Sequence, residues 1–181
     1  MNFWGLILKL SGWKVNISAP HRDKCVICVA PHTSNWDFIL GLLAYYSIGR
    51  KANFLMKKFW FFFPLNFLLK SLGGIPVYPK GSGGNLSQQI INRFNNQSYL
   101  NLAVTPEGTR SATSEWRTGF LHIAVDAHVP VQLGIIDYKH KLIEICEEIM
   151  PTGNIEEDLR NVKHFYSHHM DAALYPEKFK L

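Results

Sequence analysis

The sequence contains little cysteine, with three in 181 residues. Cys25 and Cys28 lie within one apolar run, and Cys146 is far from both. So few cysteines exclude a disulfide framework and a zinc site made of two cysteine pairs. We therefore expect three buried, reduced thiols, as in a protein exposed to the cytosol.

Long apolar runs are also missing, although 47% of the residues are hydrophobic. The most apolar stretch, residues 57–70, gathers six aromatic residues between lysines, but a proline and an asparagine interrupt it. A helix that spans a bilayer needs ~20 apolar residues. Lysines beside aromatic side chains are typical of a segment in the membrane interface, and a buried core helix explains the stretch equally well. The residues expected at the membrane are Lys57, Lys58, Trp60 and Phe61.

The first twelve residues are a second candidate for membrane contact. Apolar residues, Trp4 among them, recur there at roughly helical spacing. The segment lacks the basic start, the longer apolar run and the cleavage site of a signal peptide. We expect an amphipathic helix over residues 1–12, which either contacts the membrane through Trp4 or covers the core. The net charge of +5 favours an anionic partner of the protein.

Strand and helix patterns alternate along the chain, which predicts an α/β fold with a largely parallel or mixed sheet flanked by helices. No internal repeat or linker is visible, so we expect a single domain over residues 1–181. The expected strands are 13–18, 25–30, 52–56, 101–105, 129–137 and 141–146, and residues 73–79 are expected to form a turn that leads into a further short strand. The expected helices after the first are 35–48, 85–95, 118–127 and 154–173.

The stretch between the strand at 25–30 and the helix at 35–48 contains a histidine and an aspartate five positions apart, His32 and Asp37. A loop at the carboxyl end of a strand is where open α/β sheets bind their ligands. A carboxylate on one imidazole nitrogen fixes the tautomer and leaves the other nitrogen free to accept a proton. The pair therefore predicts a general base with its orienting acid. Ser34 followed by Asp37 also fits a helix capping box, which explains Asp37 without chemistry.

A second polar turn, residues 106–110, follows the strand at 101–105. Gly108 permits a tight turn, and Arg110 beside Glu107 is suited to grip a phosphate with two hydrogen bonds. A plain surface turn with an ion pair is the competing interpretation. The glycine-rich residues 80–84 lack the Gly-Lys-Ser/Thr ending of a phosphate-binding loop, so we interpret them as a connector.

Together these stretches resemble the glycerolipid acyltransferase family, which includes the lysophosphatidate acyltransferases. The resemblance covers residues 25–181. His-x4-Asp matches residues 32–37, a glycine-led strand matches 73–77, Pro-Glu-Gly-Thr-Arg-Ser matches 106–111, and a proline-opened strand matches 129–131. The arginine that usually closes the second motif is Pro79 here, with Lys80 beside it as a replacement, and Thr105 stands where phenylalanine is common. The long membrane-inserted amino-terminal segments of many relatives have no counterpart, which favours peripheral or monotopic attachment at the cytoplasmic face.

The resemblance implies that His32 deprotonates the hydroxyl of an acceptor, which then attacks the thioester of acyl-CoA or acyl carrier protein. It implies no cofactor and no metal. The acceptor is most simply lysophosphatidate, with another lysolipid or glycerol 3-phosphate as alternatives. The residues expected to bind the acceptor are Glu107, Gly108, Thr109, Arg110 and Lys80.

Other functions fit parts of the sequence. A hydrolase would use Ser34 as nucleophile, but no Gly-x-Ser-x-Gly elbow is present. His164, His168 and His169 fit a metal site, although a solvated helix face is the better interpretation. A lipid-binding module would explain the charge and the aromatic stretch but not the two polar loops. Nucleic-acid binding is disfavoured because the aromatic residues cluster with apolar neighbours.

Overall fold

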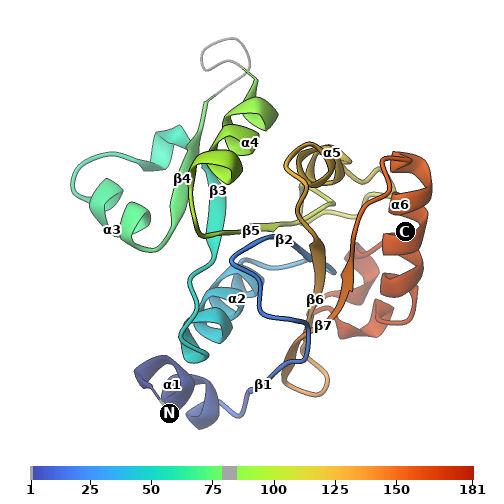
Figure 1. The fold of residues 1–181 in the computed structure, drawn as a ribbon. Coiled ribbons are helices and arrows are strands. Elements are labelled where there is room, and N and C mark those ends of the chain that lie inside the picture. Colours follow the sequence, from blue (N-terminus) through green and yellow to red (C-terminus); the bar gives the residue numbers. More distant parts are fainter. Residues whose placement is uncertain (1, 79–84) are drawn as a thin grey trace.

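A computed structural model of the protein describes residues 2–78 and 85–181. Its strands form one sheet in the order β1-β7-β6-β2-β5-β3-β4 (Figure 1). β6 and β7 form an antiparallel hairpin, and the other neighbouring strands are parallel. The predicted mixed α/β sheet is confirmed. The strands are β1 (Lys14–Ile17), β2 (Lys24–Val29), β3 (Asn53–Lys57), β4 (Gly74–Val77), β5 (Leu100–Val104), β6 (Val131–Asp137) and β7 (Leu142–Ile149).

Helices cover both faces of the sheet, as the apolar run of β2 requires. Successive side chains of a strand point to opposite faces. Val26 and Cys28 accordingly pack against α4, α5 and α6, whereas Cys25 and Ile27 lie on the face of α2. The helices are α1 (Phe3–Leu10), α2 (Asn35–Ser47), α3 (Leu65–Ser71), α4 (Leu86–Asn96), α5 (Gly119–Asp126) and α6 (Ile155–Ser167), with short 3-10 turns η1 (Lys58–Trp60), η2 (Met170–Ala172) and η3 (Pro176–Lys178).

The register of the central strands explains which loops meet. β2 pairs in parallel with β5, with Cys28 opposite Val104, and on its other side with β6, with Val29 opposite Gly134. The segments that follow these three strands therefore leave the same edge of the sheet. This edge holds residues 30–34, the turn at 106–110 and the β6–β7 hairpin.

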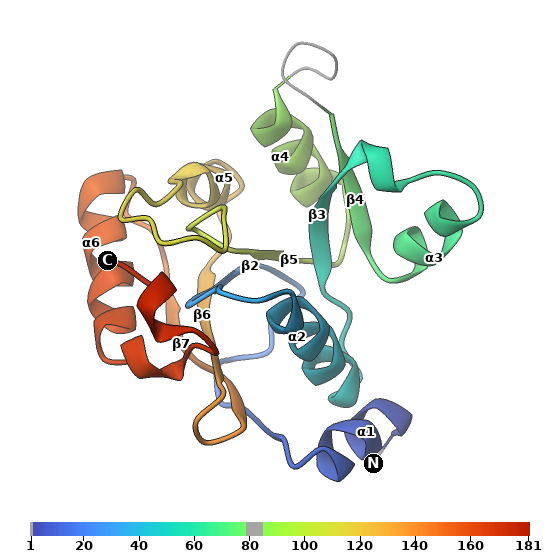
Figure 2. The same cartoon turned by 180° about the vertical axis from the view of Figure 1, so that it is seen from behind.

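The last helix is shorter than predicted. The pattern indicated a helix to about Ala173, but α6 ends at Ser167 and two 3-10 turns follow. The backbone N–H of Tyr138 donates to the Ala172 carbonyl (2.9 Å), and the N–H of Tyr175 donates to Thr33 Oγ1 (3.3 Å). These contacts hold the carboxyl-terminal segment beside the β6–β7 hairpin (Figure 2), away from the course of a continuing helix.

The prediction of three buried thiols was wrong for one of them. Cys25 and Cys28 are buried, but Cys146 is exposed. Cys146 lies just beyond Ile145, the last residue of β7 that pairs with β1. Loss of that neighbour opens this part of the strand to solvent.

Candidate active site

His32 and Asp37 are in contact at the carboxyl end of β2. His32 Nδ1 lies 3.0 Å from Asp37 Oδ2, and the aspartate is only 3% exposed. The same Oδ2 accepts the backbone N–H groups of Thr33 and Ser34, each at 2.9 Å. The capping box and the histidine contact predicted from the sequence therefore coexist, because one carboxylate oxygen serves the start of α2 and the imidazole together.

Ser34 is the N-cap of α2, and its Oγ accepts the Trp36 N–H at 3.2 Å. Within residues 2–78 and 85–181, no hydrogen bond joins this hydroxyl to the His32 ring. The serine thus has a structural use at the helix start, and the geometry of a serine nucleophile beside its base is not formed.

The turn after β5 binds the histidine loop at two points. Glu107 Oε1 accepts the backbone N–H of His32 at 2.8 Å, and the Arg110 guanidinium donates to the Asn35 side chain. Glu107 is 6% exposed, and its Oε2 has no hydrogen-bond partner among the described residues. Burial raises the pKa of Glu107. The competing interpretation, a plain surface turn with a Glu107–Arg110 ion pair, is wrong because both side chains contact the other loop.

The remaining residues of the turn shape its backbone. Gly108 has a φ of 64°, in the region that favours glycine, and the Arg117 side chain lies against it. Thr109 Oγ1 accepts the Ser111 N–H at 3.2 Å. Gly108, Thr109 and Arg110 are exposed. Lys80, the fifth residue predicted to bind the acceptor, lies outside the described residues.

The sequence reasoning missed one polar contact of the pair. The hydroxyl of Tyr138 donates to Asp37 Oδ1 at 2.6 Å. Tyr138 lies in the β6–β7 hairpin, where the sequence indicated only a connecting turn. The strand order would have identified it as a candidate, because β6 pairs in parallel with β2 and ends at the same edge. Burial and the neighbouring Asp37 raise the pKa of Tyr138, so its hydroxyl keeps its proton across the neutral range.

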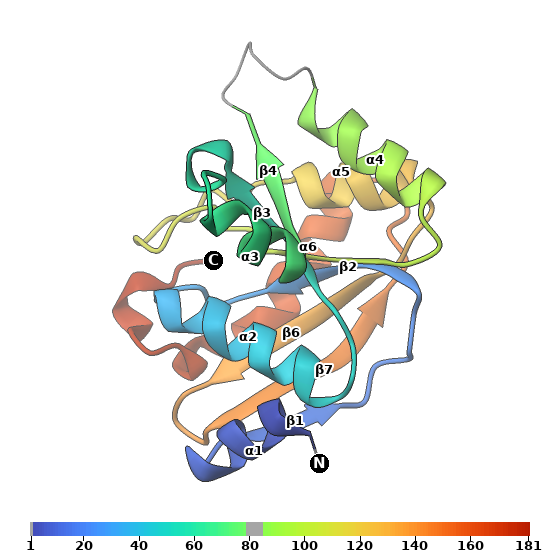
Figure 3. The same cartoon turned by 90° about the vertical axis from the view of Figure 1, so that its left-hand side faces the viewer.

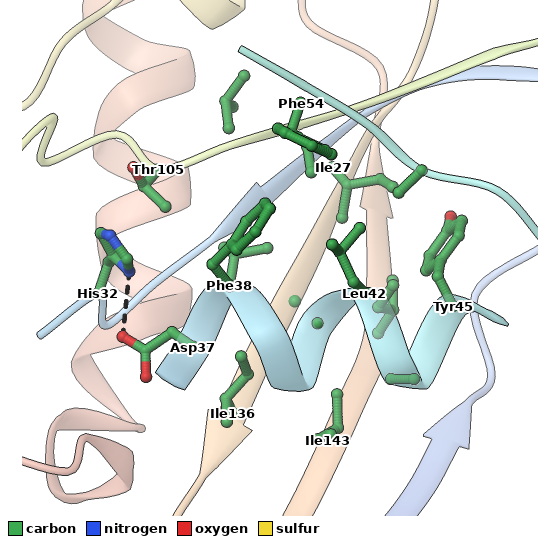
Figure 4. Close-up of a pocket in the computed structure, with 18 of the residues that line it drawn as sticks. Ile27, His32, Asp37, Phe38, Leu42, Tyr45, Phe54, Thr105, Ile136 and Ile143 are labelled. Carbon is green, nitrogen blue, oxygen red and sulfur yellow. Dashed lines mark hydrogen bonds and ion pairs between the residues drawn. The ribbon is translucent and has the colours of Figure 1, made fainter. Parts of the chain in front are cut away.

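An apolar cavity of about 350 Å³ begins at His32 and Asp37 and runs between α2 and the sheet (Figure 4). Phe38 and Leu42 of α2 line one wall, and Ile27 and Phe54 come from the facing strands. A Cβ placed on Gly41, which also lines the cavity, would meet no atom within 4 Å. The volume falls within the ~300–1,000 Å³ of typical small-molecule pockets.

Exposed apolar side chains gather on α1 and on the segment 57–71. α1, α2 and α3 all lie on the side of the molecule that faces the viewer in Figure 3. The residues of the aromatic segment with side chains at least about half exposed are Phe59 (80%), Trp60 (49%), Phe62 (53%), Phe63 (79%), Phe67 (65%) and Leu68 (55%). The interpretation of this stretch as a buried core helix was therefore wrong for most of its length.

Of the residues expected at the membrane, Lys57, Lys58 and Trp60 are exposed. Phe61 is not: it is only 7% exposed, and its ring lies against Gly74 of β4. It anchors the aromatic segment to the sheet edge. Trp4 is half-buried, with its ring 5.4 Å from that of Tyr46. In the described part of the chain, no helix has the length and apolar character to cross a bilayer.

The carboxyl-terminal histidines form no metal cluster. The rings of His164 and His168 are exposed and 5.0 Å apart, and His168 Nδ1 lies 3.0 Å from the His164 carbonyl oxygen. Among the residues that the structure describes, no group of three or more histidine, cysteine or acidic side chains is arranged to hold a metal ion.

Comparison with known proteins identifies the family and the fold. A family model described as Acyltransferase matches residues 14–133. The chain is also similar to the crystal structure of the 1-acyl-sn-glycerophosphate (LPA) acyltransferase PlsC from Thermotoga maritima, with 21% identity and a TM-score of 0.59. This similarity covers 91% of the present chain and 77% of the other, and it shows a shared fold. The search of curated proteins gave no match.

Proposed function

The chain belongs to the acyltransferase family, and from this premise we propose that it transfers a fatty acyl group from a thioester to the hydroxyl of a glycerophospholipid precursor. One observation carries the proposal. The His32–Asp37 pair lies at one end of an apolar cavity, and Arg110 is anchored beside it on the first residue of α2.

His32 would act as the general base. Its Nδ1 contacts Asp37, which leaves Nε2 to take the proton of the acceptor hydroxyl. The hydroxyl oxygen attacks the thioester carbonyl, an ester bond forms, and the carbon–sulfur bond breaks. The imidazolium then returns its proton to the departing thiolate. The base, the acceptor hydroxyl and the thioester account for every bond and proton in this reaction. The proposal therefore needs no cofactor and no covalent acyl-enzyme.

The cavity suits the acyl chain of the donor. Its lining is mainly apolar, and it begins at the residues that would perform the reaction. Burial of a hydrocarbon chain there would hold the thioester carbonyl beside His32 and convert remote binding energy into orientation. Acyl-CoA and acyl carrier protein both present such a chain.

Arg110 suits the phosphate of the acceptor. Its guanidinium is exposed and lies at the amino-terminal end of α2, where the helix dipole also favours an anion. A phosphate held here would place a nearby glycerol hydroxyl close to His32. We therefore propose lysophosphatidate as acceptor, in line with the activity named for the similar PlsC structure, with other lysolipids and glycerol 3-phosphate as the alternatives.

The decisive experiment is a radiolabelled acyl-transfer assay over a panel of these acceptors, with acyl-CoA or acyl carrier protein as donor. In His32→Ala, we expect turnover to fall by about 10²–10⁴-fold, the contribution typical of a positioned base. His21→Ala removes an exposed histidine that precedes β2, at the opposite end of the strand from His32, and serves as the matched control.

A His32→Ala protein with near-normal acyl transfer would contradict the assignment of the base. The same assay separates transfer from hydrolysis. Thioester cleavage that is as fast without acceptor as with it would identify a thioesterase, whereas cleavage that requires the acceptor supports the acyltransferase.

We also propose that the protein works while bound to the cytoplasmic face of a membrane. Support comes from the exposed aromatic side chains of residues 59–68 and from the exposed Lys57 and Lys58 beside them. Aromatic rings insert at the headgroup level, and lysines are attracted to anionic lipids. A lysophospholipid acceptor resides in the same layer, so surface attachment would bring the site to its substrate.

A further inference from the structure

The Asp37 carboxylate is held from two directions. Oδ2 receives the His32 ring and two backbone N–H groups, all from its own loop. Oδ1 receives the Tyr138 hydroxyl at 2.6 Å, from a hairpin 101 residues away in the sequence. No other group of the described residues donates to Oδ1, so without that hydroxyl the carboxylate would be fixed on one side only.

Tyr138 is itself fixed by other parts of the fold. Its ring stands edge-on to Trp13, with the centroids 5.2 Å apart. Its backbone N–H donates to the Ala172 carbonyl of the carboxyl-terminal segment at 2.9 Å. The Tyr138 ring is half-buried, and it is fixed by its own hairpin, by the segment before β1 and by the carboxyl-terminal segment. Its hydroxyl therefore reaches Asp37 from a fixed position.

We propose that Tyr138 is a positioning residue for acyl transfer, which acts through Asp37 on the orientation and basicity of His32. The inference rests on the proposed function of His32 as the base. A donor on Oδ1 stops rotation of the carboxylate, so that Oδ2 stays directed at Nδ1. It also withdraws negative charge from the carboxylate, which moderates the stabilisation of the protonated imidazole.

The two effects give separate kinetic signatures in Tyr138→Phe, which keeps the ring and removes the hydroxyl. The carboxylate gains freedom to rotate, and the imidazole spends less time in the productive orientation. We therefore expect kcat to fall by about tenfold to hundredfold, with the KM for both substrates within about twofold. Asp37 would also attract the imidazolium more strongly. The acidic limb of the pH profile of kcat/KM should then move to higher pH.

The other titratable groups around the pair are the same in this variant. Glu107 faces His32 from the turn after β5, and Tyr175 faces Tyr138 from the carboxyl-terminal segment. Since neither is altered, a shift of the pH profile reports the loss of the Tyr138 hydroxyl. Tyr99→Phe is the matched control, because it removes a tyrosine hydroxyl that bonds the Lys51 carbonyl (3.0 Å) elsewhere in the fold.

The experiment measures kcat, KM, the pH profile and thermal unfolding for the wild type, Tyr138→Phe and Tyr99→Phe. A drop in kcat with a shifted profile in the first variant alone supports the proposal. Unchanged kcat and an unshifted profile overturn it, and so does a loss of activity that merely follows a lowered melting temperature. If the wild type transfers no acyl group, the proposed function has failed instead.

Substitution of 3-fluorotyrosine at position 138 provides a second test if Tyr138→Phe does not fold. The fluorinated phenol is a stronger donor in nearly the same volume, so it should move the acidic limb in the opposite direction, to lower pH. An unshifted limb in this protein would overturn the proposal.

Discussion

Two regions of the molecule depart, in opposite ways, from the usual placement of apolar side chains inside and polar side chains outside. One is the set of loops around His32, and the other is the aromatic segment 57–71. The first region buries polar groups: Asp37 is 3% exposed and Glu107 is 6% exposed. The second exposes large apolar groups, with Phe59 and Phe63 about four-fifths accessible. Elsewhere in the described chain the core between the sheet and its helices is mainly aliphatic and aromatic, with Asn101, Gln132 and Asp158 as buried polar residues.

The difference lies in how each region compensates for its unfavourable groups. Every buried carboxylate of the site receives hydrogen bonds, from His32, Tyr138 and backbone N–H groups. At Asp37 those bonds reach both oxygens, offset the desolvation of the charge and fix its position, whereas at Glu107 only Oε1 is bonded. The aromatic segment has no such compensation in the protein itself, and a patch of this kind normally marks a surface that binds something apolar. The polar groups of the site are thus held mainly by contacts within the folded chain, whereas the membrane attachment proposed above would cover the aromatic segment.

Of the variants that test this comparison, we expect the largest effect, a rise in the KM for the acceptor, in Arg110→Ala. Arg110→Ala removes the cation beside the histidine without disturbing the buried carboxylates. We expect the KM for a phosphorylated acceptor to rise by about tenfold to hundredfold, because a hydrogen bond to a charged group contributes about 1.5–3 kcal/mol. Steady-state kinetics with varied acceptor measure the change, and Arg93→Ala, an exposed arginine of α4, is the control. An unchanged KM would place the phosphate elsewhere.

A smaller effect is expected in the aromatic segment. Phe63 is 79% exposed and its ring contacts that of Phe67, so Phe63→Ser should leave the melting temperature unchanged. Loss of one inserted ring should weaken binding to vesicles that contain anionic lipid by about tenfold. Co-sedimentation with such vesicles measures this. Met150→Ser removes an exposed apolar side chain just beyond β7 and should bind like the wild type. Equal binding by both variants would show that the segment serves another partner.

The smallest effect concerns stability and pH at Glu107. Burial raises the pKa of Glu107 above its ordinary value of 4.5, so the native state holds this proton more tightly than the unfolded chain. The native state therefore loses stability as the pH rises from about 4.5 through the raised pKa. Glu107→Gln keeps an acceptor for the His32 N–H but does not titrate. It should lose less free energy of unfolding than the wild type between about pH 4 and about pH 7.

Denaturant unfolding at the two pH values measures this difference. The exposed Glu115→Gln is the control, and it should change with pH as the wild type does. A Glu107→Gln protein with the same pH dependence as the wild type would show that burial of this carboxyl group has no consequence for folding.

Much of this organisation was predictable from local pattern. Alternation of strand and helix patterns predicted the mixed sheet, because the spacing of apolar residues that distinguishes a strand from a helix depends only on neighbouring residues. His32 and Asp37 are five positions apart, so their contact depended only on a loop and one helical turn. The length of α6 was not predictable in the same way. Its end is decided by contacts of Ala172 and Tyr175 with the hairpin and with Thr33, which are distant in sequence.

The sequence by itself determined most element types, the His32–Asp37 pair and the polar turn at 106–110, because each depends on residues that are near neighbours along the chain. Only the tertiary structure decided that Glu107 supports the His32 backbone, that Phe61 is buried while its neighbours are exposed, and that Tyr138 reaches Asp37. The physical reason is the strand order. Parallel pairing of β2 with β5 and β6 brings three loops to one edge of the sheet. Which strands become neighbours cannot be predicted from a local sequence pattern.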